Sequence, residues 1–145
     1  MQRIILFLSV IISVRSATAQ YKPMDPGSMV QFKIKNLGFS VSGFFTGLQG
    51  NIRFDPAHPD QGHFDVSVDA ASVNTDNSTR DEHLREENYF DVKKYSRIHF
   101  QSTKILPANK AGAFIMSGNL TIKNTTKEIS FPFTATAGQT GFVFK

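Results

Sequence analysis

The chain has 145 residues, a formal net charge of +4 and no cysteine. This length suffices for one domain with a sizeable hydrophobic core and is short for two. A small basic excess without a basic cluster argues against nucleic acid as a partner. Because cysteine is absent, packing rather than disulfide bonds has to stabilise the fold.

The first 19 residues predict a secretory signal peptide. Arg3 precedes the apolar run 4–14, and Ala17-Thr18-Ala19 offers a small-residue cleavage pattern. The apolar run is shorter than the roughly 20 residues that span a bilayer, so no integral membrane segment is expected after cleavage. We therefore expect a periplasmic or secreted protein. Its parts would be a signal peptide (1–19), an N-terminal lead (20–27) and a single domain (28–145).

Apolar and polar residues alternate along most of the domain, which is typical of half-buried antiparallel strands. In the segment 38–54 the alternation changes phase after Gly47, which predicts one long strand bent by a β-bulge. A turn rich in Pro, Asp and Gly follows at 55–62. The predicted strands are 28–36, 38–54, 63–71, 97–105, 112–123 and 127–137, and another begins at 141–145.

This pattern predicts an all-β fold, either an antiparallel barrel or a sandwich, with one short helical insert. The last residues, 142–145, have a strand pattern without a stop signal. An unpaired edge is avoided by soluble proteins, so we expect that closing strands of the domain are missing from this chain. The alternative is an open or dimer-closed sheet, and a homodimer is compatible with the sequence.

The segment 80–92, RDEHLREENYFDV, concentrates acidic, basic and imidazole side chains as an active site would. A helix is predicted over 79–87, with Asn77 or Ser78 as its cap. His83 lies one turn from Glu86 and Glu87, but nothing supplies further metal ligands. The chain also has no activated nucleophile and no Gly-rich phosphate loop. We therefore predict no catalytic residue, metal site or cofactor.

The same segment has a structural interpretation. Arg80 and Asp81 are expected to make buried polar contacts that tie the helix to the barrel. Leu84, Tyr89 and Phe90 are expected to anchor it through apolar contacts.

The predicted inner face combines large aromatic side chains with very small residues. A barrel of about eight strands is wide enough either to be filled by side chains or to hold one small ligand. We predict an apolar tunnel for a hydrocarbon chain; a filled core is the alternative. The candidate lining residues are Phe32, Phe39, Val41, Phe45, Phe64, Val66, Phe100, Phe114, Met116, Gly118, Phe131 and Phe133.

Three stretches resemble the YceI-like polyisoprenoid-binding family: VQFKIKNLGFSVSGFFTGLQGNIRFDP, VDAASVNTDNSTRDEHLREENYFDVKKYSRIHFQSTKI and GNLTIKNTTKEISFPF. They cover residues 28 to 137. The chain has Asp76 where the family commonly has Gly, and Asp tolerates a left-handed turn.

The resemblance implies a lipocalin-like antiparallel β-barrel of about eight strands with a helical insert, exported by bacteria. It implies a long isoprenoid chain (polyprenyl or quinone-like) inside the barrel, for transport, storage or sensing, and no catalysis at the 80–92 segment. The alternative function is a filled barrel that acts as a protein-interaction module in an envelope stress pathway. A Gly118→Phe substitution is expected to separate the two by blocking lipid uptake.

Overall fold

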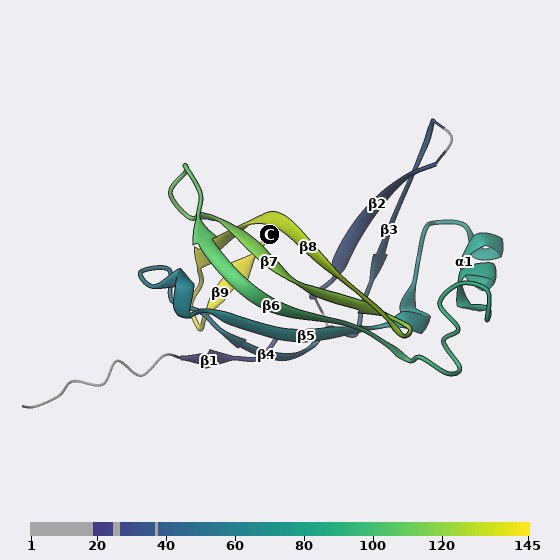
Figure 1. Ribbon diagram of the computed structural model, residues 1–145, viewed down its shortest axis with the longest axis horizontal. Coiled ribbons are helices and arrows are strands. Elements are labelled where there is room, and N and C mark those ends of the chain that lie inside the picture. The colour runs from purple at the N-terminus through teal and green to yellow at the C-terminus, as the bar shows by residue number, and fades with distance from the viewer. Residues whose placement is uncertain (1–18, 25–26, 37) are drawn as a thin grey trace, which may run out of the picture.

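The computed structural model describes residues 19–24, 27–36 and 38–145. The predicted signal peptide lies outside these residues apart from Ala19. The described chain is mostly β-strand, with one short α-helix, and its larger sheet curls into a half-barrel (Figure 1). The predicted fold class, a lipocalin-like antiparallel β fold with a short helical insert, is therefore confirmed.

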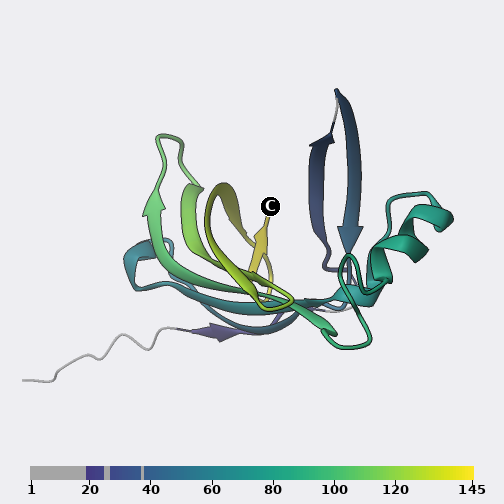
Figure 2. The same cartoon turned by 45° about the vertical axis from the view of Figure 1, so that its right-hand side comes forward.

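The larger sheet has seven antiparallel strands in the order β1-β4-β5-β6-β7-β8-β9. Figure 2 shows it curving around one side of the molecule, with β9 turned inward. The strand β1 lies within the predicted N-terminal lead and pairs with β4 at the sheet edge. The bounds are β1 Gln20–Tyr21, β4 Gln49–Arg53, β5 His63–Asp69, β6 Arg97–Pro107, β7 Ala113–Ile122, β8 Thr125–Ala137 and β9 Phe142–Phe144.

The two-residue alternation predicts correctly which face of this sheet is buried. In β5, Phe64 and Val68 are buried, while their neighbours point to the convex face. The sequence did not predict the β-bulge in β6, where the register with β7 shifts between Ser102 and Lys104. The extra residue brings Ile105, 1% exposed, to the same buried face as Ser102.

The second sheet is a hairpin of β2 (Val30–Asn36) and β3 (Phe39–Phe45), which stands apart from the larger sheet (Figure 2). The prediction of one bent strand over 38–54 is wrong. β3 ends at Phe45, β4 begins at Gln49, and the two strands belong to different sheets.

The break between β3 and β4 has a clear cause in hydrogen bonding. The amide of Thr46 donates to Ser72 Oγ at 2.8 Å, and the carbonyl of Gly47 accepts from Arg97 Nη2 at 2.8 Å. Gly47 also has φ +66°, a conformation that favours glycine. The change of phase in the sequence therefore marks a crossing between sheets.

The helix α1 spans Ser78–Arg85, close to the predicted 79–87. Asn77 is its cap, because its side chain accepts from the Arg80 amide at 2.9 Å. The helix ends where Glu86 takes an extended conformation. Asp76 has φ +58°, a left-handed conformation that Asp tolerates.

The short 3₁₀ turns η1 (Pro59–Gln61) and η2 (Ala70–Ser72) complete the described elements. None of the helices in the described segments combines the length and apolar character needed to traverse a bilayer.

The buried side chains form two clusters. The aromatic cluster consists of Ile52, Phe54, Phe64, Ile105, Phe114, Met116 and Phe133. The junction cluster consists of Phe45, Val68, Ala70, Val73 and Ile98, where the hairpin meets the larger sheet. Leu84 and Phe90 pack against the junction cluster, as predicted for anchors, but Tyr89 is 56% exposed. Tyr89 therefore does not act as an apolar anchor.

Candidate functional site

The interior of the half-barrel is filled by aromatic rings at one end. Phe54, which directly follows β4, lies with its ring centroid between 5.1 and 6.1 Å from five other phenylalanine rings. These rings belong to Phe64, Phe114, Phe133, Phe142 and Phe144. Three of the strands involved, β7, β8 and β9, are not neighbours of β4 in the sheet. The curl of the sheet therefore brings its two halves into direct contact here.

Most of the predicted lining residues lie on this concave side. Phe64, Phe114, Met116 and Phe133 are buried in the aromatic cluster, and Val66 and Phe100 pack against it. Phe45 is in the junction cluster and Phe32 packs against it, with a centroid distance of 5.2 Å between the two rings.

Phe131 occupies a more open place on the same face. It is the register partner of the buried Met116, and its ring lies 5.4 Å from that of Phe100. Its side chain is 37% exposed. Phe131 therefore borders the space beyond the filled aromatic end.

Phe39 and Val41 lie on the hairpin, away from the aromatic cluster. Phe39 is 77% exposed because it pairs with Asn36 at the turn, beyond the reach of the larger sheet. Val41 is half-buried and pairs with Ile34, which is 56% exposed. The register of the hairpin places Phe39, Val41 and Val30 on one apolar strip, on the same face as Phe32 and Phe45.

Gly118 is covered by a neighbouring ring. A Cβ at this position would stand 2.5 Å from Phe100 Cζ and 2.5 Å from the carbonyl oxygen of Gln101. The small residue accommodates the ring and the close approach of the backbone. A Gly118→Phe substitution would therefore collide with the backbone, and it cannot serve as a clean test of lipid uptake.

A polar cluster fixes the segment before α1. Asp81, 6% exposed, accepts from the Thr75 amide at 2.9 Å and from Thr75 Oγ1 at 2.6 Å. Arg80 donates from Nε to Thr75 Oγ1 at 2.7 Å and from Nη2 to the Thr75 carbonyl at 2.8 Å. Both side chains converge on Thr75, which lies just before α1 and outside the strands. The prediction that Arg80 and Asp81 tie the helix to the barrel is therefore wrong, because their bonds stay within the helical segment.

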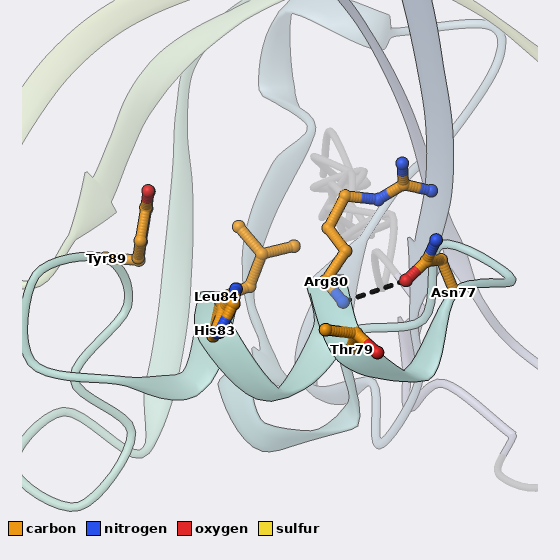
Figure 3. Close-up of a pocket in the computed structure, with 6 residues that line it drawn as sticks. All are labelled: Asn77, Thr79, Arg80, His83, Leu84 and Tyr89. Atoms are coloured by element: carbon orange, nitrogen blue, oxygen red, sulfur yellow. Dashed lines mark hydrogen bonds between the residues drawn. The ribbon is translucent and has the colours of Figure 1, made fainter.

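Beside this cluster lies an open pocket of about 440 Å³, which the sequence did not predict (Figure 3). The only signal in the sequence was the density of polar groups in the 80–92 segment. The lining residues are Asn77, Thr79, Arg80, His83, Leu84 and Tyr89.

The convex face carries polar side chains on β5 and β6, and also the exposed apolar pair Leu106 and Ile115. His99 Nε2 lies 2.6 Å from Asp65 Oδ1, and Arg97 binds both the carbonyl and the hydroxyl of Ser67. A second open pocket of about 320 Å³, lined by Gln20, Asn51, Arg53 and His63, also lies on this face. In residues 19–24, 27–36 and 38–145, no group of three or more His, Asp or Glu side chains is placed to hold a metal ion.

One carboxyl group has a clearly shifted pKa. Asp55, in the turn after β4, accepts a hydrogen bond from His58 at 3.1 Å and another from the Ala57 amide at 2.9 Å. These two bonds hold the pKa of Asp55 below its ordinary value. Both hydrogen bonds lie within the turn itself, so the shift concerns local structure.

A curled antiparallel sheet with an apolar concave face, a filled aromatic end and a short helix defines a lipocalin-like β-barrel class of protein. The chain belongs to the YceI-like domain family, whose model matches residues 21–145. The resemblance noted in the sequence is thereby confirmed.

Related sequences support this family assignment. A UPF0312 protein of Photorhabdus laumondii is 32% identical over 77% of this chain, and one of Ectopseudomonas mendocina is 32% identical over 83%. The chain spans 58% and 64% of the lengths of these two relatives.

Two solved structures share the fold. BcnA of Burkholderia cenocepacia matches with a TM-score of 0.69 at 25% identity, covering 80% of this chain and 72% of BcnA. A YceI protein of Campylobacter jejuni matches with a TM-score of 0.62 at 35% identity, covering 83% of this chain and 72% of that protein.

Proposed function

We propose that this protein is an exported carrier that binds a long isoprenoid chain against the concave apolar face. The observation that carries the proposal is the set of apolar side chains left exposed on the concave face of the larger sheet and on the apolar strip of the hairpin. Phe131 borders the filled aromatic end, and Ile34 and Phe39 continue the apolar side of the hairpin at 56% and 77% exposure. Large apolar side chains gathered on an exposed face are typical of a binding site.

The physical chemistry of such a surface favours a hydrocarbon chain. Burial of each methylene contributes about 0.8 kcal/mol, so ten methylenes contribute roughly 8 kcal/mol before the cost of ordering the chain. The aromatic and aliphatic side chains of the strip offer no hydrogen bond to a tail. Affinity would therefore depend on tail length and only weakly on its chemical details.

Family membership supports the proposal. The YceI-like resemblance implies an isoprenoid ligand, and the match extends over both the hairpin and the larger sheet. A polyprenyl or quinone-like chain would serve transport, storage or sensing without catalysis. The second candidate is a protein-interaction module, favoured by the filled aromatic end, where side chains already occupy the interior.

The proposal is tested by mass spectrometry of organic extracts from the purified protein, followed by titration with a long polyprenol. Phe131→Asp places a charge on the concave face, while Ile115→Asp places one on the convex face of β7 at a similarly exposed position, 43% against 37%. We expect Phe131→Asp to abolish binding and Ile115→Asp to leave it unchanged.

Two other outcomes would favour the interaction module. One is a folded wild type that carries no lipid and takes up no polyprenol. The other is an equal loss of binding in both variants. Export is tested separately by cell fractionation and by the N-terminal residue of the mature protein, for which we expect Gln20.

A further inference from the structure

We propose that the turn end of the β2–β3 hairpin docks on the surface of a lipid bilayer that contains anionic head groups. In the docked protein, Phe39 and Ile34 enter the interface between the head groups and the acyl chains, while Lys33 and Lys35 contact the lipid phosphates. Docking needs no bound isoprenoid, so it goes beyond the proposed function.

The turn end of the hairpin projects from the molecule. In Figures 1 and 2 the hairpin rises away from the larger sheet, with its turn pointing outward. Its other end is fixed, because Phe45 is buried in the junction cluster and the amide of Phe44 donates to the Asn74 carbonyl at 2.9 Å. Phe39 lies roughly 20 Å farther along β3, since a strand rises about 3.4 Å per residue. The turn is therefore the part of the hairpin that is free to meet another surface.

Exposure along the apolar strip increases toward this turn. On β3, Phe45 is 7% exposed, Val41 is half-buried, and Phe39 is 77% exposed, the highest value among the large apolar side chains that the structure describes. Ile34, on the facing strand beside Val41, is 56% exposed. Two large apolar side chains are thus left in water at the end of the hairpin. Such exposed apolar side chains are typical of a surface that docks on another apolar medium.

The opposite face of the hairpin is basic. Lys33 and Lys35 are exposed there, where they pair with two serines of β3. Residues 27–54 include no Asp or Glu. The ion pairs of the described residues lie elsewhere, so no described carboxylate neutralises either lysine within 4.0 Å. This charge complements anionic head groups, whereas a second hairpin facing this one would bring like charges together.

The backbone sets the depth of docking. β2 and β3 form a sheet of their own, so near the turn the outer edges of the hairpin have no strand partner among the described residues. Unpaired amide and carbonyl groups are too costly to enter the hydrocarbon core. The long stems of Lys33 and Lys35 allow their ammonium groups to stay at the phosphates while Phe39 lies deeper. The hairpin therefore docks at the interface, as amphipathic helices do.

The chain has no tryptophan, so a single tryptophan can report the position of the turn. The test uses Phe39→Trp in the predicted mature form, residues 20–145, because the apolar run 4–14 would itself partition into a bilayer. Vesicles of phosphatidylcholine alone are compared with vesicles of equal parts phosphatidylcholine and phosphatidylglycerol. With the anionic vesicles we expect a blue shift of the emission and quenching by lipids brominated on their acyl chains. Ile115→Trp, at a 43% exposed convex position, is the control and should show neither effect.

Lysine substitutions test the electrostatic contribution. Lys33→Gln combined with Lys35→Gln should weaken binding to the anionic vesicles by about 25-fold, roughly fivefold for each lysine, and leave binding to the neutral vesicles unchanged. The matched control, Lys104→Gln combined with Lys110→Gln, removes the same charge from exposed lysines on β6 and in the turn after it. It should stay within about twofold of the wild type, because charges far from the membrane are screened.

Phe39→Ser tests the apolar contribution. It should weaken binding to both kinds of vesicle by about tenfold, because the ring no longer enters the interface. Circular dichroism checks that every variant is folded.

Three outcomes would overturn the bilayer as the partner. One is the absence of vesicle binding by the folded wild type. Another is an equal loss of binding in the two lysine variants, which would mean that net charge alone attracts the protein. The third is a dimer, detected by sedimentation without vesicles, that Phe39→Ser dissociates; it would identify a second copy as the partner. The vesicles contain no isoprenoid, so none of these outcomes bears on the carrier function, which the polyprenol titration tests separately.

Discussion

Tyr21 and Phe142 pack edge to face with their ring centroids 5.7 Å apart, although they belong to β1 and β9, the two opposite edges of the seven-stranded sheet. The contact brings the edges together at the aromatic end. Gly141 lies beneath the same ring, since a Cβ there would be 3.3 Å from Tyr21 Cδ1. Side chains rather than backbone hydrogen bonds therefore join the sheet edges at this point.

A double-mutant cycle of Tyr21→Ala and Phe142→Ala should show this contact directly. We expect a coupling free energy of about 0.5–1.5 kcal/mol, the usual range for an edge-to-face aromatic pair. Urea unfolding of the four proteins measures it. A control cycle of Tyr21→Ala with Val143→Ala, which removes a half-exposed side chain from the same strand, should show coupling near zero. Equal coupling in both cycles would mean that β9 loosens as a whole.

Phe54→Ala should be among the most destabilising core substitutions. Its ring is 1% exposed and contacts five other phenylalanine rings, so its removal leaves a cavity that close-packed neighbours cannot fill. We expect a loss of about 3–5 kcal/mol in the free energy of unfolding. Ile115→Ala, at a 43% exposed convex position, is the control and should cost much less. Similar losses at both positions would contradict the assignment of the core.

Ser102→Ala tests the hydrogen bond at the bulge. The hydroxyl of Ser102, 6% exposed, accepts from the buried Phe64 amide at 2.8 Å. Without it the amide has no partner, and we expect a cost of about 1–3 kcal/mol. Chemical denaturation measures the change. Ser117→Ala, which removes an exposed hydroxyl on β7, should stay within about 0.5 kcal/mol of the wild type.

The turn after β4 should have a pH dependence set by Asp55. Because the folded protein lowers the pKa of this carboxyl, its ionised form stabilises the fold above the unfolded pKa of about 3.9. That contribution disappears as the pH falls through the lower, folded value. An NMR titration of the Asp55 carboxyl carbon measures the shift. In His58→Ala the pKa should rise toward its ordinary value, and an unchanged pKa would exclude His58 as the main cause.

The buried face of each strand could be predicted, because successive side chains of a β-strand point to opposite faces of the sheet. Phe64 and Phe133 illustrate this success, since each lies among alternating neighbours and is buried. The cap of α1 was also predictable, because Asn77 is a favoured capping residue and Asp81 lies in the first turn that follows it. These are local rules, and they need no knowledge of the rest of the fold.

The errors arose where distant segments decide the conformation. The strand is interrupted at Thr46 and Gly47 by hydrogen bonds to distant residues. Ser72, 26 residues away, binds the Thr46 amide, and Arg97, 50 residues away, binds the Gly47 carbonyl. The pocket at Arg80 depends on where the fold places Thr75 and Tyr89. Neither arrangement has a signature within a short window of sequence, although the change of phase at Gly47 did mark the position of the break.

The hydrogen bonds that break the strand at Thr46 and Gly47 have a consequence for the order of folding. The hairpin β2–β3 needs only neighbouring residues to form, so its turn can close within microseconds. Its attachment requires Ser72 and Arg97, which reach their positions after β5 and β6 have paired. We therefore expect the hairpin to dock in a late step, and substitutions of Arg97 to accelerate unfolding more than they slow folding.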